Sequence, residues 1–417
     1  MESCFLPIEL CENIMDVLSV YIESPDGGWS KWPRYAGGSQ RALRACALTC
    51  HAWRVRAQYL LWSFPSLGHR RQLARFKQAI RRSPNIALIR GLVLQSSNLN
   101  DDNTPDLRTA GELFMHSFPY MEYFMCTGID FGRGPPLQVL RMRPPFFSSI
   151  TSLALFGCTF QSLRAMLDVV WACSNLATLV IGVNVIKSKR CSAAGFQNLC
   201  TAAENLRACR KLTRLNLDAD TWKQFWTPAN NGLSGVGRVF GYAVTELVFQ
   251  TACAPEVFIS FFRDSFPALR SVTVAFGWFD KNRELPSWLH VVLATGRPVP
   301  GILKTIVLEC SHWWEGHSCC KLAVGTSEDR ASGSAQRRPE IVPELAELVL
   351  RLRCKHPARH AAYIWDILPG FRNVLRFEYR ERWNDAWKPY TVLPRDVPRL
   401  LAQDTNSDSD PDSDSDS

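Results

Sequence analysis

Five cysteine and histidine side chains within eleven residues are the first candidates for chemistry. Thiolate and imidazole are the ligands that zinc prefers, so such a segment could hold a metal ion. The spacing, however, matches no paired C-x-x-C or H-x-x-x-H framework, adjacent cysteines rarely bind one ion together, and two tryptophans stand inside the segment, which favours packing. We therefore expect no metal site and no cofactor at these residues: Cys310, His312, His317, Cys319 and Cys320.

The other residues that could do chemistry are scattered. The sequence shows no secretory signal, so we do not expect its fifteen cysteines to form disulfides. We interpret them as buried free thiols, as at Cys46, Cys158 and Cys200. The sequence contains no glycine-rich phosphate loop, no G-x-S-x-G, no H-E-x-x-H and no kinase signature. We therefore expect no catalytic residue, and we interpret the protein as a non-enzyme.

The N-terminal residues predict amphipathic helices. Pro7 has the backbone angle of a first helical turn, and Leu10, Ile14 and Leu18 follow at a spacing of four, with acidic residues on other faces. A second apolar stripe repeats every three or four residues, and Thr49 could cap a break within it. The members of this second stripe are Leu43, Cys46, Ala47, Cys50, Trp53, Ala57 and Leu60.

The two halves together resemble the F-box motif, L-P-x-E-(L/I)-x-x-x-I-x-x-x-L followed by a leucine-rich run that ends in C-x-x-W. The matching residues are Leu6 to Leu10, Ile14, Leu18, Leu43, Leu48, Cys50 and Trp53, and the run Leu43–Trp53 is most similar to the F-boxes of large fungal families. An insert at residues 23–40, rich in glycine and proline, departs from the short form, and we expect it to be a loop. The alternative interpretation is an ordinary helical core.

The resemblance implies a three-helix F-box domain at residues 1–66. Such a domain docks on the Skp adaptor and, through it, on the cullin of an SCF-type ubiquitin ligase, so the chain would be a non-catalytic substrate receptor for an unidentified protein target. The adaptor-binding residues that the resemblance implies are Leu6, Pro7, Ile8, Glu9, Leu10, Ile14, Leu18, Leu48, Cys50 and Trp53.

A basic segment follows at His69–Arg82, within a linker at residues 67–85. Leu73, Phe76, Ala79 and Ile80 fall on one side of the predicted helix, and basic residues occupy the rest. A nucleic-acid surface is one interpretation. We favour a linker helix with a solvated basic face, because Lys and Arg are dispersed over the whole chain and no known nucleic-acid motif is present.

Residues 86–400 repeat a short theme of the form φ-x-x-φ-x-φ, in which φ is apolar. This is the strand half of a leucine-rich repeat, and we expect an irregular α/β solenoid of one strand and one helix per repeat, with polar residues along the concave side as the target site. Regular repeats normally have an asparagine after the strand, and we expect these repeats to lack it. The predicted strands are Ile89–Leu94, Ile150–Leu155, Leu176–Ile181, Leu212–Leu217, Val244–Phe249, Leu269–Val274, Leu303–Leu308 and Val374–Tyr379, with Phe118–Phe124 as a degenerate one.

Two polar segments predict disorder, a loop at residues 326–340 and a Ser/Asp tail at residues 401–417. The tail contains six aspartates and no basic residue, so the rest of the chain carries a net charge of +15 (48 basic against 33 acidic residues). Its serines resemble substrates of acidophilic kinases, and a purely solubilising role is equally open.

Composition places the chain among globular proteins, since 46% of its residues are hydrophobic and 21% are charged. No apolar run approaches the roughly 18 residues of a membrane span, so we expect no membrane partner and a cytoplasmic or nuclear location. Two alternatives to the ligase receptor stay open: a repeat protein that acts as a scaffold outside any ligase, and a repeat protein that binds nucleic acid through its basic body.

Overall fold

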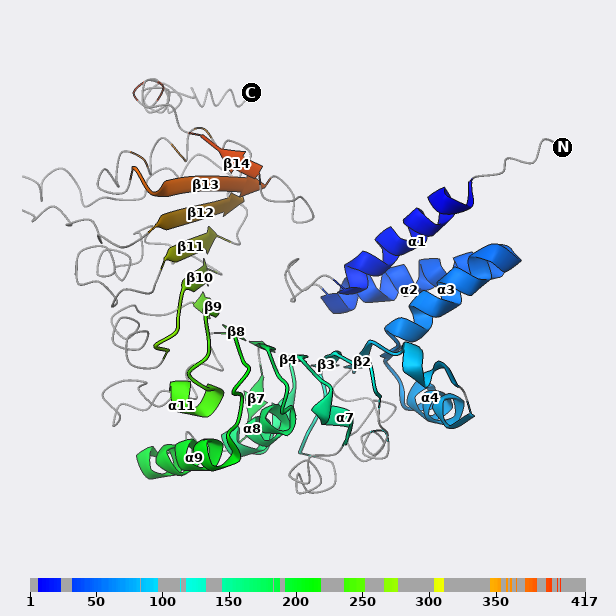
Figure 1. Cartoon of the computed structure of the whole chain (residues 1–417), viewed down its shortest axis with the longest axis horizontal. Helices are drawn as coiled ribbons and strands as arrows, with labels where there is room; N and C mark the ends of the chain where they lie inside the picture. The colour runs from blue at the N-terminus through cyan, green and yellow to red at the C-terminus, as the bar shows by residue number, and fades with distance from the viewer. Residues whose placement is uncertain are drawn as a thin grey trace, which may run out of the picture. The chain divides into compact units, whose positions relative to one another are not determined.

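The structure is a computed structural model (Figure 1) that resolves two compact units, Met1–Val244 and Thr245–Ser417, each described by itself. The described residues are 7–23, 32–82, 84–96, 118–132, 145–182, 184–187, 192–218, 236–251, 266–276, 304–310, 346–353, 372–380 and 388–391, with Leu113, Ala358, Ala361, Trp365, Asp396 and Pro398.

The first unit opens with three helices and a short strand, and then alternates strands with helices. Its first elements are α1 (Ile8–Glu23), α2 (Trp32–Thr49), α3 (His51–Ser63), β1 (Ser66–Leu67), α4 (Arg70–Arg82) and the 3-10 helix η2 (Pro84–Leu88). The alternating part comprises β2 (Gly91–Gln95), β3 (Tyr123–Thr127), α7 (Pro145–Ser148), β4 (Ser152–Phe156), β5 (Thr159–Phe160), α8 (Leu163–Ala172), β6 (Thr178–Gly182), β7 (Val185–Ile186), α9 (Ala193–Leu206), β8 (Arg214–Leu217) and α11 (Val236–Phe240).

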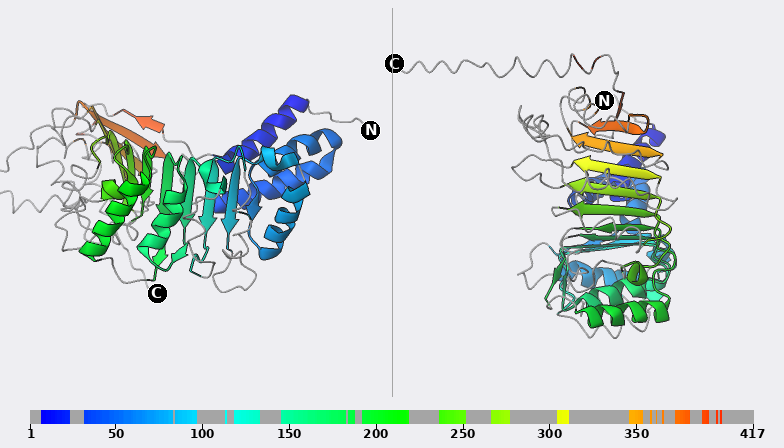
Figure 2. Two further views of the ribbon diagram at one scale, coloured as in Figure 1. Left: turned by 60° about the horizontal axis from the view of Figure 1, so that its bottom comes forward. Right: turned by 90° about the vertical axis from the view of Figure 1, so that its left-hand side faces the viewer.

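The strands of the first unit form a parallel sheet in the order β1-β2-β3-β4-β6-β8, while β5 and β7 pair separately. Helices follow the strands because a parallel connection has to cross back along the sheet. They lie on one side of it (Figure 2). On that side the Phe124 ring of β3 meets the Phe146 ring of α7 at 5.0 Å between centroids, and the indole N–H of Trp171 in α8 donates to the carbonyl of Val239 in α11 at 3.1 Å.

The opposite face of this sheet is also buried. Val93, Met125, Ala154 and Val180 are neighbours in register on β2, β3, β4 and β6, and each is at most 3% exposed. They share one apolar cluster with side chains of α1 to α3 and with Phe64, whose ring packs over Gly91. The prediction that polar residues line this face is wrong for these four strands, because the three N-terminal helices cover it.

The second unit contains five parallel strands in the order β9 (Glu246–Thr251), β10 (Ser271–Phe276), β11 (Thr305–Cys310), β12 (Glu347–Arg353) and β13 (Leu375–Arg380), and β14 (Lys388–Tyr390) pairs antiparallel with β13. Leu247, Val272, Leu348 and Phe377 are buried on one face. The α/β class is therefore confirmed by the first unit, and a mostly parallel arrangement of strands is present in both units.

Each of the eight predicted strand hexamers overlaps an observed strand, and the prediction differs from the structure at two further positions. The degenerate strand lies at Tyr123–Thr127, later than predicted, because the apolar pattern is carried by Met121, Phe124 and Cys126. The predicted strands do not include β12, although Leu345–Leu350 has the same apolar pattern and its last four residues begin this strand. The predicted loop at residues 326–340 and the tail at residues 401–417 lie outside the described residues.

Asn184 corrects the expectation that no asparagine follows a strand. It lies two residues after β6 and is 8% exposed. Its Oδ1 accepts from the N–H of Cys158 at 2.8 Å, and its Nδ2 donates to the carbonyl of Leu155 at 3.0 Å. The side chain thus satisfies two backbone groups of the preceding repeat, which would otherwise be buried without partners.

Candidate functional site

The motif residues gather at one end of the three-helix bundle. The start of α1, the end of α2 and the start of α3 lie together at the end remote from the strands (Figures 1 and 2). The Pro7 carbonyl accepts from the N–H of Leu10 at 3.1 Å and of Cys11 at 3.2 Å, so α1 begins where the proline predicts. This arrangement brings Pro7, Leu10, Leu48 and Cys50 to the same end.

The buried stripe of α1 differs from the predicted one. Cys11 and Met15 are 2% and 0% exposed and pack into the unit, whereas Leu10 and Ile14 are 45% and 43% exposed. The predicted spacing of four is present, but the buried face is rotated by one residue. The two motif positions therefore form a partly exposed apolar ridge on the surface of α1.

The second half of the motif is divided between α2 and α3, with the break at Cys50. The Thr49 hydroxyl donates to the Ala45 carbonyl at 3.1 Å and does not cap α3, so the predicted break is present without its predicted cap. Leu48 is 82% exposed. Because α2 begins at Trp32, the second part of the predicted loop at residues 23–40 is helical; Pro33 suits a first helical turn.

The structure separates the predicted adaptor-binding residues into three groups. Trp53 is half-buried against the apolar cluster, and Leu6, together with the side chains of Ile8 and Leu18, lies outside the described residues. Sequence reasoning missed Val55 and Tyr59 on α3, which are also exposed apolar residues and fall off the stripe that the spacing selects. The exposed predicted residues are Pro7, Glu9, Leu10, Ile14, Leu48 and Cys50.

No family model matches this chain, and a search of the curated proteins finds no match. The function of the surface at the end of the bundle must therefore be inferred from the residues on that surface.

An ion pair fixes α1 against α3. The Arg56 guanidinium donates to both Asp16 carboxylate oxygens, at 2.7 and 2.8 Å from Nη2, and its Nε reaches Oδ1 at 3.0 Å. The two side chains are 35% and 41% exposed, so water screens them in part. We expect a double-mutant cycle with Asp16→Asn and Arg56→Met to give a coupling free energy of about 0.5–1 kcal/mol in urea unfolding, reduced in high salt. A coupling near zero would contradict a role in positioning α1.

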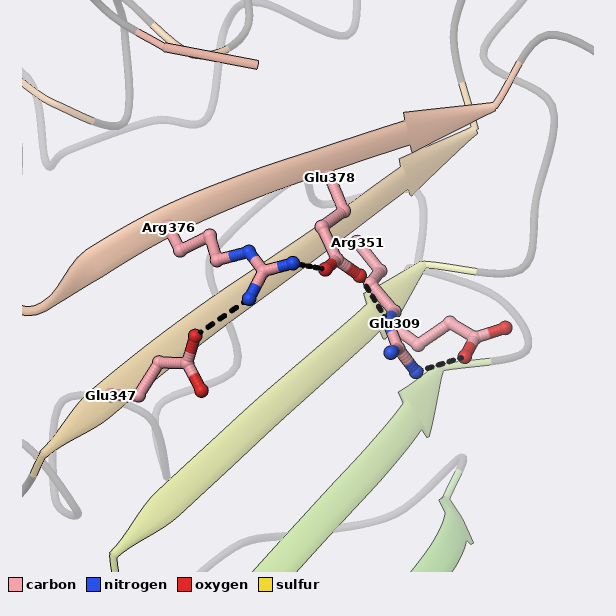
Figure 3. A network of polar contacts seen from close by, with 5 residues as sticks. All are labelled: Glu309, Glu347, Arg351, Arg376 and Glu378. Atoms are coloured by element: carbon pink, nitrogen blue, oxygen red, sulfur yellow. Dashed lines mark hydrogen bonds and ion pairs between the residues drawn. The ribbon is translucent and has the colours of Figure 1, made fainter. Parts of the chain in front are cut away.

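A network of charged side chains marks the second unit, on the strand face opposite Leu348 and Phe377 (Figure 3). Glu378 is 9% exposed and accepts from Arg351 at 2.8 Å and from Arg376 at 2.7 Å. Arg376 also reaches Glu347 at 3.1 Å, and Arg351 lies 3.9 Å from Glu309. These contacts join three carboxylates and two guanidinium groups across three adjacent strands.

We expect the buried thiols of the first unit to be unreactive near neutral pH. Burial raises the pKa of Cys158 and of Cys209 to about 12 and the pKa of Cys126 and Cys173 well above the usual value, so these thiols stay protonated near neutral pH. Cys46 is only half-buried, although the sequence predicted a buried thiol there.

Within the described ranges there is no group of three or more His, Cys, Asp or Glu side chains that could hold a metal ion. The Cys/His segment at Cys310–Cys320 falls outside them, apart from the backbone of Cys310 in β11. Among the same residues, no helix has the length and apolar character needed to cross a membrane.

Proposed function

We propose that this protein is an F-box substrate receptor, which binds the Skp adaptor of an SCF-type ubiquitin ligase through α1 to α3. The observation that carries the proposal is the exposure of Leu10, Ile14 and Leu48. These three residues belong to the motif that resembles an F-box, and they lie on the surface although the helices have an apolar core of their own. An ordinary helical core would bury them.

Exposed apolar side chains favour a protein partner for this end of the bundle. Burying one fully exposed leucine or isoleucine side chain gains about 1.5–3 kcal/mol, so a partner that covered these side chains would gain apolar burial. Within the first unit the bundle end also faces away from strands β2 to β8, so an adaptor bound there would leave these strands uncovered by the adaptor. No chemistry on this chain is needed, because a receptor acts by holding its target near the ligase.

The target would bind on the repeat region, and the network in the second unit is the better site for it. In the first unit α1 to α3 already cover the strand face that would otherwise be available. In the second unit the corresponding face presents Arg376 and Glu347, whose side chains are 51% and 35% exposed. Half-exposed charges on a sheet can exchange partners with a polar target.

Co-purification of the adaptor tests the proposal. The adaptor is co-expressed with the wild-type chain, with the double variant Leu10→Asp/Leu48→Asp, and with the control Val185→Asp/Leu206→Asp, which changes two exposed apolar residues far along the chain. We expect the wild type and the control to retain the adaptor and the first variant to lose it, with affinity lowered on the order of 100-fold or more.

The variants change exposed side chains, so all three proteins should give the same melting temperature, which excludes misfolding as the cause of a loss. If the Leu10→Asp/Leu48→Asp variant still retained the adaptor, or if the wild type never bound it, the F-box assignment would be wrong.

A further inference from the structure

Helix α4 has a cationic outer face. Its sequence, RRQLARFKQAIRR, contains six basic residues and no acidic one. Leu73, Phe76 and Ile80 are 0%, 8% and 5% exposed, as the spacing predicted, and the Phe76 ring lies 6.2 Å from that of Trp62 in α3. The apolar side of the helix is therefore fully used in packing, and only the basic side is open to a partner.

Three arginines on this face make no ion pair with an acidic side chain among the described residues. Arg70, Arg71 and Arg75 are exposed, and none of them makes an ion pair within the part of the chain that the structure describes. Arg70 and Arg71 also stand in the first turn, where the helix dipole disfavours cations. A bound anion would pair with the exposed arginine charges and would offset the unfavourable effect of the helix dipole on Arg70 and Arg71.

We propose that the outer face of α4 binds the phosphate backbone of double-stranded DNA. Guanidinium groups match phosphate oxygens in pairs, and nucleic-acid interfaces are polar and strongly positive. Among the described side chains of α4 no large apolar one is exposed, so a protein partner would find no apolar anchor there. The exposed positions of α4 carry no aromatic ring for stacking single-stranded bases, which favours a duplex.

The proposed contact does not depend on base sequence, since phosphate contacts position a protein without reading bases. It also goes beyond adaptor binding, because α4 is separate from the exposed ends of α1 and α2. The sequence favours a solvated linker helix, and the structure adds that three of its arginines make no ion pair with any residue it describes.

The test is anisotropy of a short fluorescent DNA duplex with the full chain at several salt concentrations between about 50 and 200 mM. The variant Arg70→Gln/Arg71→Gln/Arg75→Gln should bind at least about tenfold more weakly at the lowest salt. Each lost phosphate contact lowers the slope of log affinity against log salt by about 0.9, so the slope should fall by about 2.7. A matching Arg→Lys triple variant should keep most of the affinity, since it keeps the charges.

The control Arg207→Gln/Arg210→Gln/Arg270→Gln removes the same charge from exposed arginines elsewhere. It should change the slope by less than half as much as the α4 variant. Equal effects of the two variants would overturn the proposal, because net charge alone would then explain the binding. Absence of duplex binding at the lowest salt, or displacement of the duplex by an acidic polypeptide at equal charge concentration, would overturn it as well.

Discussion

Phe146→Ala is expected to lower the free energy of unfolding of the first unit by about 3–5 kcal/mol, the range for removing a fully buried aromatic ring. The Phe146 side chain is 0% exposed, and its ring lies 5.0 Å from that of Phe124, 4.9 Å from Phe147 and 5.6 Å from Phe118, at steep angles. Alanine would remove the transfer free energy of the ring and leave a cavity that short helix α7 cannot close. Urea unfolding followed by near-UV circular dichroism measures the change.

Tyr120→Ala is the matched control for this experiment. Tyr120 is 51% exposed, and its main contact is with the Arg90 guanidinium, 4.9 Å from the ring centre. Its loss should cost no more than about 1 kcal/mol. If Phe146→Ala cost as little as Tyr120→Ala, the aromatic cluster between β3 and α7 would not be the centre of this core.

Asn184→Leu is expected to lower the free energy of unfolding by about 2–6 kcal/mol. Leucine has the same branched shape but leaves the Cys158 N–H and the Leu155 carbonyl buried without partners, and each unsatisfied group costs about 1–3 kcal/mol. Urea unfolding gives the total, and amide hydrogen exchange at Cys158 should accelerate. Asn198→Leu, at an exposed position of α9, should change stability by less than about 0.5 kcal/mol. Equal effects at the two positions would contradict the bridging role of Asn184.

The strands were predictable because the two apolar residues at the end of each hexamer alternate with a period of two, and burial of one face of the sheet requires that alternation. The observed strands β4 and β6 each begin at the third residue of the predicted hexamers Ile150–Leu155 and Leu176–Ile181. Counting along the repeat would have found Asn184, which is the ninth residue when Leu176 is counted as the first. The same count from Ile150 places Cys158 at the ninth residue.

The candidate site was predictable only in part, because helical spacing defines a stripe without saying which of two adjacent stripes is buried. Leu10 and Cys11 are neighbours, and tertiary packing against α2 and α3 selects Cys11 and Met15. The sequence also could not predict that α1 to α3 bury Val93 and Met125. It depends on how distant elements meet, and no local pattern encodes that.

The central claim is that the exposed end of α1 to α3 is the adaptor-binding surface. Hydrogen–deuterium exchange of the chain with and without the purified Skp adaptor tests it most directly, because it locates the contact. We expect the adaptor to slow exchange at the start of α1, at the end of α2 and at the start of α3, and to leave β9 to β13 unchanged. Slower exchange confined to the strands, or no change in the three helices, would contradict the account.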